Sequence, residues 1–573
     1  MLNREFIQNS PFQIRLANPL SDASGLRLTR EWNGSLCRSE LVNEGSKPIT
    51  IGEIVLFEIA HDLPADTRIH GEGFTMLSQT GGTLGEPVDI GGYTDRGHYR
   101  IPQPDDATTV YGMLRLSPPG KDHILLTFVT GCRFVGKFYI RESAIEVVLD
   151  AEGLTIDPGE TWRLEDFAAM TGPSLPDLFA AVPKYVQQTH PAQWPKEPPT
   201  GWCSWYCFGA KVTAQNIIDN ADFIARNIPE LKYIQIDDGY QSAMGDWLDT
   251  TDAFGEDIKS IVAKIKERGL EPAIWVAPFV AEENSKVFKE HPDWFVKDAD
   301  GAPLRSDKVT FGGWRHGPWY CLDGTHPSVQ AHLEHVFKTM HREWGCTYFK
   351  LDANFWGAIH GGRFFNPKAT RVQAYRQGMQ AIERGADRNF LLGCNHPMWP
   401  SLGVVQGTRT SNDISRTWKS IRDTARENLM RAWQNNRLWW NDPDCVVLTG
   451  DLSDEELTFH ATVVYLCGGM TLSGDDLTKL PPERLEMLRK LLPPTAVASA
   501  FEDDSLSVGV VELADRRIIG LLNWSDEPQT ISADLPANAH ITDFWTGEDL
   551  GVHETKIGVG EMKPHSARLL VCR

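Results

Sequence analysis

The hydrophobic and polar positions of this chain follow two different patterns. Up to about residue 175, short runs alternate apolar and polar residues between Gly, Pro, Asn and Asp, which is typical of antiparallel strands. The clearest runs are 12–16, 51–57, 110–116, 124–129 and 144–149. They predict a large antiparallel β-sandwich in residues 1–175.

From Thr200 onward, short apolar strands alternate with longer helical patterns, after a predicted linker helix at 176–186. Eight such repeats predict a (β/α)8 TIM barrel within residues 176–493. An open doubly wound sheet is the weaker alternative, because it would need a Gly-rich turn after its first strand, where this chain has Trp-Cys-Ser-Trp. The predicted strands are 201–206, 233–236, 271–277, 348–352, 389–394, 403–409, 438–441 and 470–473.

Strand patterns return after the barrel, at 507–511, 518–523 and 567–571. They predict a small antiparallel β-sandwich in residues 494–573. The chain of 573 residues is long enough for these three domains.

Composition narrows the classes of function. The net charge is −21, from 56 basic and 77 acidic residues, which disfavours binding to nucleic acid or to anionic membranes. No run reaches the roughly 18 apolar residues of a membrane span, and the N-terminus does not resemble a signal peptide. Ten cysteines without a CxxC pair indicate reduced thiols, so we expect a cytoplasmic protein, and the sequence leaves a homo-oligomer open.

Charged residues stand where the fourth predicted barrel strand ends. Lys350 and Asp352 are two residues apart, so their side chains share a face of the strand. Burying two charges costs several kcal/mol unless they are paired or used. Taken alone, the motif is best interpreted as a structural ion pair.

The other strand ends change that interpretation. In a TIM barrel the functional residues lie at the carboxyl ends of the strands. Acids that repel one another gather there, which favours a binding or catalytic site over a purely structural role. The candidates are Trp205, Asp237, Asp238, Trp275, Cys394, Asn395, Arg409 and Asp413, with further acids at 442, 475 and 476.

Paired carboxylates with aromatic platforms are suited to the cleavage of glycosidic bonds. One carboxylate attacks the anomeric carbon or activates water, and the other protonates the leaving oxygen. A Mg²⁺ or Ca²⁺ site is the main alternative, but Lys350 already supplies a cation beside Asp352. His316, His326, His360 and His396 have no ligand spacing and are interpreted first as loop or core residues.

With these residues in view, the sequence resembles glycoside hydrolase family 36, the α-galactosidases of clan D. That family has an N-terminal β-supersandwich, a barrel and a small C-terminal β-domain. The motifs that carry the resemblance are GWCSWY at 201–206, IDDGY at 236–240, GDWL at 245–248, WVAPF at 275–279, HPDW at 291–294, YFKLD at 348–352, LGC at 392–394, Arg409 with Asp413, and WNDPD at 440–444.

The resemblance implies a retaining mechanism without a metal or organic cofactor. Asp352 would be the nucleophile and Asp413 the acid/base. The remaining implied roles concern the sugar: Asp237, Asp238 and Lys350 at O4 and O6, Trp205, Trp247 and Trp275 around the pocket, and Cys394 and Arg409 near C2.

The sequence departs from the family at three places. Asn395 stands where many relatives have Gly, which leaves the preferred 2-substituent open. The Gly-Pro of close relatives is missing near Asp413. Relatives place a Trp from the N-terminal domain in the active site, and Phe74 is the predicted substitute.

We therefore expect a retaining exo-α-galactosidase acting on small oligosaccharides. The alternatives are a transglycosylase of the raffinose-synthase type, an enzyme shifted toward N-acetylgalactosamine or β-L-arabinopyranose, and a non-catalytic sugar-binding protein. A pure binder would gain nothing from a buried nucleophile, so intact Asp352 and Asp413 argue against the last of these.

Overall fold

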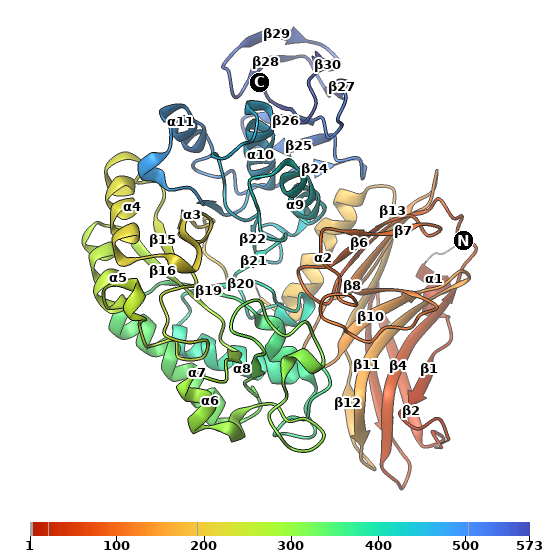
Figure 1. Ribbon diagram of the computed structural model, residues 1–573. Coiled ribbons are helices and arrows are strands. Elements are labelled where there is room, and N and C mark those ends of the chain that lie inside the picture. The colour runs from red at the N-terminus through yellow and green to blue at the C-terminus, as the bar shows by residue number, and fades with distance from the viewer. Residues whose placement is uncertain (1–3, 21, 192, 502) are drawn as a thin grey trace.

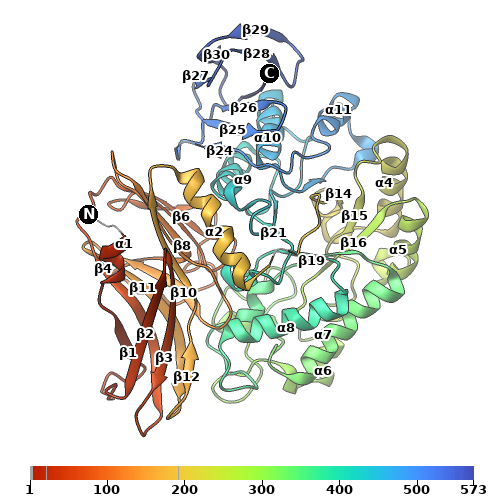
Figure 2. The ribbon, with the colours of Figure 1, turned by 180° about the vertical axis from the view of Figure 1, so that it is seen from behind.

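The computed structural model describes residues 4–20, 22–191, 193–501 and 503–573. The chain folds into three parts (Figure 1). The N-terminal sheet lies beside the barrel, and the C-terminal strands lie at the end of α9 and α10; the view from behind shows the same arrangement (Figure 2). No helix in the described ranges has the length and apolar character that crossing a bilayer requires.

The N-terminal part is antiparallel, as the alternating pattern predicted. Its main strand order is β1-β4-β11-β10-β8-β9-β13-β3-β12. Its two longest strands, β4 and β11, pair with each other, and inward side chains such as Ile54, Phe57 and Val147 are fully buried. The strands are β1 (Gln13–Leu16), β2 (Leu26–Asn33), β3 (Leu36–Asn43), β4 (Ile49–Ala60), β5 (Arg68–Glu72), β6 (Gln79–Gly82), β7 (Pro87–Ile90), β8 (Thr108–Ser117), β9 (His123–Phe128), β10 (Val135–Ile140), β11 (Ala144–Ile156), β12 (Thr161–Arg163) and β13 (Phe167–Gly172), and α1 (Arg4–Gln8) precedes them.

The central part is a barrel of parallel strands in the order β22-β21-β20-β19-β16-β15-β14-β23. A parallel bridge between Val446 and Ser473, and a hydrogen bond of 2.8 Å from Met470 N to Asn441 O, bring the two edges together. The fold class predicted from the sequence is therefore confirmed. The strands are β14 (Thr200–Cys203), β15 (Tyr233–Ile236), β16 (Glu271–Val276), β19 (Tyr348–Leu351), β20 (Phe390–Gly393), β21 (Gly407–Arg409), β22 (Trp440–Asp442) and β23 (Thr471–Ser473).

Helices cover the outside of the barrel, and local sequence fixes where several of them begin. Capping boxes start α4 at Thr213, α8 at Thr370 and α10 at Ser453, each satisfying amide groups that the first helical turn leaves unpaired. The helices are α2 (Leu175–Thr189), α3 (Trp205–Phe208), α4 (Ala214–Asn227), α5 (Ile258–Glu267), α6 (Lys286–Glu290), α7 (Pro327–Thr339), α8 (Arg371–Ala386), α9 (Trp418–Met430), α10 (Asp454–Cys467) and α11 (Pro482–Lys490); a two-stranded sheet of β17 (Val280–Ala281) and β18 (Tyr320–Cys321) lies between α5 and α7.

One predicted βα repeat lacks its helix. The fully described stretch from Cys394 to Gln406, between β20 and β21, contains only a 3-10 turn at Trp399–Ser401. Pro397 and Pro400 disfavour a helix there. The N-terminal part packs in its place: Trp399 Nε1 donates to Phe128 O at 2.7 Å, and Thr75 bridges to Pro397.

The C-terminal part has a six-stranded antiparallel sheet and a separate strand pair. It rests on the barrel helices, since Trp545 Nε1 donates to Thr462 Oγ1 of α10 at 2.8 Å. Its strands are β24 (Ala500–Phe501), β25 (Val508–Glu512), β26 (Arg517–Leu522), β27 (Gln529–Asp534), β28 (Ala539–Asp543), β29 (Asp549–His553), β30 (Lys556–Met562) and β31 (Ala567–Cys572).

A buried ion pair joins the N-terminal sheet to the barrel. Arg431, just after α9, donates from Nε and Nη2 to Glu72 Oε2 of β5 at 2.9 and 2.6 Å, and both side chains have 0% exposure. The remaining donors of Arg431 reach the backbone oxygens of Met76, Ser78 and Thr410. Gln434 Nε2 donates to the other oxygen of Glu72 at 2.6 Å. Every charged atom of the pair is thus satisfied.

We predict that Arg431→Met lowers the free energy of unfolding by about 3–5 kcal/mol, because Glu72 is left as an uncompensated buried charge. Urea unfolding followed by tryptophan fluorescence measures this. Lys232→Met is the matched control, since the exposed Lys232–Glu197 pair should contribute no more than about 1 kcal/mol. Equal, small losses in both variants would contradict the role given to Arg431.

Candidate active site

A cavity of about 290 Å³ lies where the barrel strands end and the N-terminal part covers them. Eight of the residues predicted for the site line it, and all eight come from the carboxyl ends of β14, β15, β16, β19, β20 and β21. They are Trp205, Asp237, Asp238, Trp275, Lys350, Asp352, Asn395 and Asp413.

Asp352 follows β19 directly and is 8% exposed. Trp275 Nε1 donates to its Oδ2 at 3.0 Å, while Asn395 Nδ2 and the Ala353 amide donate to Oδ1 at 2.8 and 2.7 Å. Ala353 has a φ of 52°, a left-handed conformation that is unusual for Ala and that turns its amide back onto the carboxylate. Three neutral donors therefore fix the orientation of Asp352.

The ion-pair partner of Lys350 is Asp237, with Nζ and Oδ2 2.9 Å apart. The predicted pairing with Asp352 was wrong, although both side chains do line the same cavity. Burial opposes the charge of Lys350, but Asp237 outweighs burial and raises the pKa of Lys350 well above its usual value. Lys350 is therefore a permanent cation at the closed end of the cavity.

Asp238 has a cation of its own. Arg315 Nε donates to its Oδ2 at 3.2 Å, Arg315 Nη2 contacts Oδ1, and Gln241 Nε2 donates to Oδ1 at 2.6 Å. Burial raises the pKa of Asp238, and Arg315 works against that rise. The tandem acids are thus paired with two different cations from two different elements.

Asp413 lies on the loop after β21 and differs from Asp352 in its exposure. Its side chain is 65% exposed, and Arg409 Nη2 donates to it at 3.1 Å. The same nitrogen also donates to the buried Asp444 at 2.9 Å. Arg409 therefore bridges the exposed carboxyl of Asp413, which lines the cavity, and the buried carboxyl of Asp444, which does not.

Two buried carboxylates hold the backbone on either side of Asp413. Glu427 of α9, which is 1% exposed, accepts from Asn412 N at 2.6 Å and from Asn412 Nδ2 at 3.1 Å. Asp444, which is 3% exposed, accepts from Ile414 N at 2.8 Å. Burial raises the pKa of Glu427 to about 7. We refer to Glu427 and Asp444 as the loop clamp.

Four predicted site residues do not line the cavity. Trp247 packs edge-to-face behind Trp275, with ring centroids 5.8 Å apart. Cys394 and Arg409 are buried beneath the cavity wall, where Arg409 Nη1 contacts Cys394 Sγ at 3.9 Å. These three side chains support the residues that face the cavity.

The prediction for Phe74 was wrong. Its ring is 2% exposed and packs against Tyr111 and Phe355, with the Arg371 guanidinium 4.4 Å from its centroid. It belongs to the interface in which the N-terminal part replaces the missing barrel helix, as Met398 N donates to its backbone oxygen at 2.8 Å. The N-terminal residues that do reach the cavity are Leu77, Tyr93, His98 and Tyr99.

Sequence reasoning also missed residues from the barrel. Phe311 and Trp314 line the cavity, and the neighbouring Arg315 binds Asp238. All three lie in the long connection between β16 and α7, and unusually long connections are often functional. Asn412 was missed as well, although it directly precedes Asp413.

The acids at the last strand ends serve the fold. Asp475 accepts from Arg416 Nη2 at 2.7 Å and from Leu448 N at 2.6 Å, and Asp476 caps a 3-10 turn by accepting from Thr478 N. Neither lines the cavity. Burial raises the pKa of Asp442 to about 6, while Arg409 opposes this. Asp475 and Asp476 therefore stabilise the fold and do not belong to the cavity.

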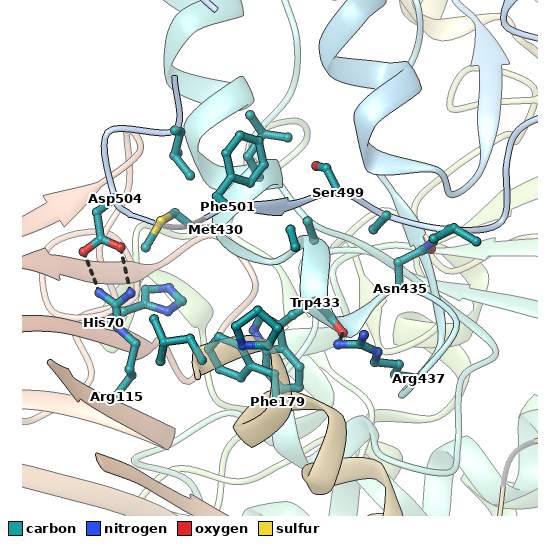
Figure 3. Close-up of a pocket in the computed structure, with 18 of the residues that line it drawn as sticks. His70, Arg115, Phe179, Met430, Trp433, Asn435, Arg437, Ser499, Phe501 and Asp504 are labelled. Atoms are coloured by element: carbon teal, nitrogen blue, oxygen red, sulfur yellow. Dashed lines mark hydrogen bonds and ion pairs between the residues drawn. The ribbon is translucent and has the colours of Figure 1, made fainter. Parts of the chain in front are cut away.

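A second cavity, of about 270 Å³, lies where the three parts meet (Figure 3). Its two sides differ: Asp504 accepts two hydrogen bonds from Arg115, at 2.7 and 2.6 Å, and Trp433 stacks on Phe179. The half-buried Asp504 is therefore already paired with a cation, whereas Asp352 at the first cavity accepts hydrogen bonds from neutral groups. Within the described ranges, no group of three or more His, Cys, Asp and Glu is arranged to hold a metal ion.

Parts of this chain are similar in sequence to known glycosidases. Residues 232–380 match the Melibiase family model. The α-galactosidase 3 of Arabidopsis thaliana is 21% identical over 409 residues, which cover 66% of this chain and 82% of that protein. The A type blood α-D-galactosamine galactosaminidase of Flavonifractor plautii is 30% identical over 158 residues, which cover 26% of this chain and 14% of that protein.

Two solved structures have the same fold. The GH36 α-galactosidase AgaA from Geobacillus stearothermophilus matches with a TM-score of 0.69 at 13% identity, over 98% of this chain and 86% of that one. TtGalA, an α-galactosidase from Thermus thermophilus, matches with a TM-score of 0.62 at 22% identity, over 85% and 98%. The chain is therefore a glycoside hydrolase whose residues 232–380 match the Melibiase family model, and it shares its fold with the GH36 α-galactosidases.

Proposed function

We propose that this protein is a retaining exo-α-galactosidase that releases terminal α-linked galactose from small oligosaccharides. The observation that carries the proposal is the single cavity that brings together Asp352, Asp413 and the Lys350–Asp237 pair on a barrel related to α-galactosidases. The closed end of the cavity, with its buried charges, suits the hydroxyl groups of one sugar ring.

In the first step, an Asp352 oxygen attacks the anomeric carbon of the galactose unit. The bond from that carbon to the glycosidic oxygen breaks, and Asp413 gives that oxygen its proton. The three neutral donors on Asp352 hold its carboxylate in position for the attack. The product is a galactosyl ester of Asp352 and a free leaving group.

In the second step, Asp413 takes a proton from water, and the water oxygen attacks the anomeric carbon. The ester bond to Asp352 breaks, and galactose leaves with its original configuration after two inversions. The exposure of Asp413 suits this role, because both the leaving group and the water approach from the solvent side. No metal or organic cofactor is needed for either step.

The sugar preference rests on the floor of the cavity. Asp237, Asp238 and Lys350 would bind the O4 and O6 region, and Asn395 both orients Asp352 and borders the C2 side. The partial likeness to a galactosaminidase makes N-acetylgalactosamine the second sugar to test. The cytoplasmic location, the homo-oligomer and the balance between hydrolysis and transfer stay predictions.

We predict the effect of removing the proposed nucleophile. Asp352→Ala should lower kcat on 4-nitrophenyl α-galactoside by at least about a thousandfold, because no carboxylate remains to form the ester. Added azide should restore turnover and give β-galactosyl azide, the inverted product. Initial rates and NMR of the product measure both effects.

Asp476→Ala is the matched control, since it removes a strand-end carboxylate that lies outside the cavity, and it should keep near-normal activity. An azide product of retained configuration, or full activity of Asp352→Ala, would refute the nucleophile assignment. Poor turnover of the α-galactoside by the natural enzyme, with good turnover of another aryl α-glycoside, would refute the choice of sugar.

We also predict the effect of removing part of the loop clamp. Glu427→Ala frees the backbone next to Asp413, so it should impair protonation of the leaving group. We expect kcat/KM to fall about tenfold or more for methyl α-galactoside but little for 2,4-dinitrophenyl α-galactoside, whose leaving group needs no proton. Glu427→Gln keeps an oxygen that can accept from Asn412 N and should retain most activity on both substrates.

Asp444→Asn should show the same dependence on the leaving group, through the Ile414 amide. Asp413→Ala provides the reference pattern. If Glu427→Ala lowered kcat/KM equally for both substrates, the clamp would serve the fold in general and would not position Asp413.

A further inference from the structure

Two exposed aromatic side chains stand at the mouth of the cavity. Trp314 is 40% exposed and Tyr93 is 43% exposed, and both line the same cavity as Asp352 and Asp413. They come from different parts of the chain: Tyr93 follows β7 of the N-terminal sheet, and Trp314 lies between β16 and α7. Large aromatic faces left in water beside a polar cavity often mark a binding surface.

The position of Trp314 is fixed by its surroundings. Its ring meets the edges of two fully buried rings, Trp319 at 4.5 Å and Trp356 at 6.1 Å between centroids. Gly313 before it has a φ of +116°, and a Cβ there would lie 2.6 Å from the Trp319 ring. Only glycine fits this approach, so the loop presents Trp314 in one preformed arrangement.

Tyr93 is held by a stack that crosses the domain interface. Its ring lies 4.4 Å from His98, and His98 stacks on Phe311 at 3.9 Å with an angle of 27°. Burial lowers the pKa of His98 to about 4, so the imidazole is neutral near pH 7. The positive charge of the nearby Arg315 is paired with the buried carboxylate of Asp238. The exposed wall is therefore aromatic and uncharged.

Exposure to solvent distinguishes this aromatic wall from the residues that are proposed to bind galactose. Asp237, Asp238 and Lys350 at the closed end are each at most 5% exposed, whereas Asp413 is 65% exposed on the solvent side. The proton donor must reach the oxygen between galactose and the leaving group. The leaving group therefore extends outward from Asp413 toward solvent, and Trp314 and Tyr93 are the exposed aromatic rings that line the same cavity.

We propose that Trp314 and Tyr93 form the binding subsite for the leaving group, and that it accepts a neutral ring with an apolar face, such as a pyranose or an aryl group. This inference rests on the proposed α-galactosidase function and adds the two residues that would favour a ring as the leaving group over a small alkyl group. The apolar face of the ring would stack on the indole, and its hydroxyl groups would remain in water.

The test compares two substrates in the full-length enzyme. Melibiose carries a glucose ring in this subsite, while methyl α-galactoside has only a methyl group. Trp314→Ala should reduce kcat/KM for melibiose about tenfold more than it reduces kcat/KM for methyl α-galactoside, the size expected for one aromatic stacking contact. Tyr93→Ala should shift the same ratio in the same direction, and inhibition by free galactose should stay unchanged in both variants.

Phe365→Ala is the matched control, because Phe365 is 62% exposed but does not line the cavity, and its substrate ratio should equal that of the natural enzyme. An unchanged ratio in both Trp314→Ala and Tyr93→Ala would overturn the subsite. A change in molecular mass by light scattering without a change in the ratio would also overturn it, and would assign these rings to an interface between copies of the chain. If the natural enzyme cleaved neither substrate, the proposed function would fail first, and the subsite with it.

Discussion

The buried pair of Arg431 and Glu72 is the interaction on which the site depends. It lies between the N-terminal sheet and the barrel, and both side chains are completely buried. Arg431 also donates to the backbone of Met76 and Ser78 on one side and of Thr410 on the other. One guanidinium thus fixes both the N-terminal wall of the cavity and the start of the loop that carries Asp413. A charge buried so fully stays only while all its partners are in place, so the two domains are held in one relative position.

The partners of the cavity carboxylates differ from one carboxylate to the next. Asp237 and Asp238 each have a cation, Lys350 and Arg315, and these pairs form a rigid polar floor. The hydrogen bonds on Asp352 come only from neutral groups, so they orient the carboxylate without neutralising it. Asp413 shares Arg409 with Asp444 and faces solvent. This contrast matches the different roles proposed for the two catalytic carboxyl groups.

The missing helix between β20 and β21 explains how a second domain reaches a barrel site. Pro397 and Pro400 keep that segment from forming a helix, and the N-terminal sheet occupies the space. Phe74 packs within this interface, whereas Tyr93, His98 and Tyr99 line the cavity. The prediction for Phe74 followed from its place in the sequence, but which ring faces the cavity depends on how the two domains pack.

The sequence alone determined the barrel and eight of the residues that line its cavity. Strand periodicity identified the eight strands, and because parallel strands end at one rim, residues directly after them had to converge; Asp237, Asp352, Asn395 and Asp413 do line one cavity. Only the tertiary structure decided which residues these side chains pair with. Lys350 bonds to Asp237, 113 positions away, and not to its near neighbour Asp352. Arg315 and Trp314 reach the site from a long loop, where no periodic pattern constrains position, and Glu427 contacts the Asp413 loop because of how α9 packs against it. Spacing along a strand fixes which way a side chain points, but its partner is set by the fold that surrounds it.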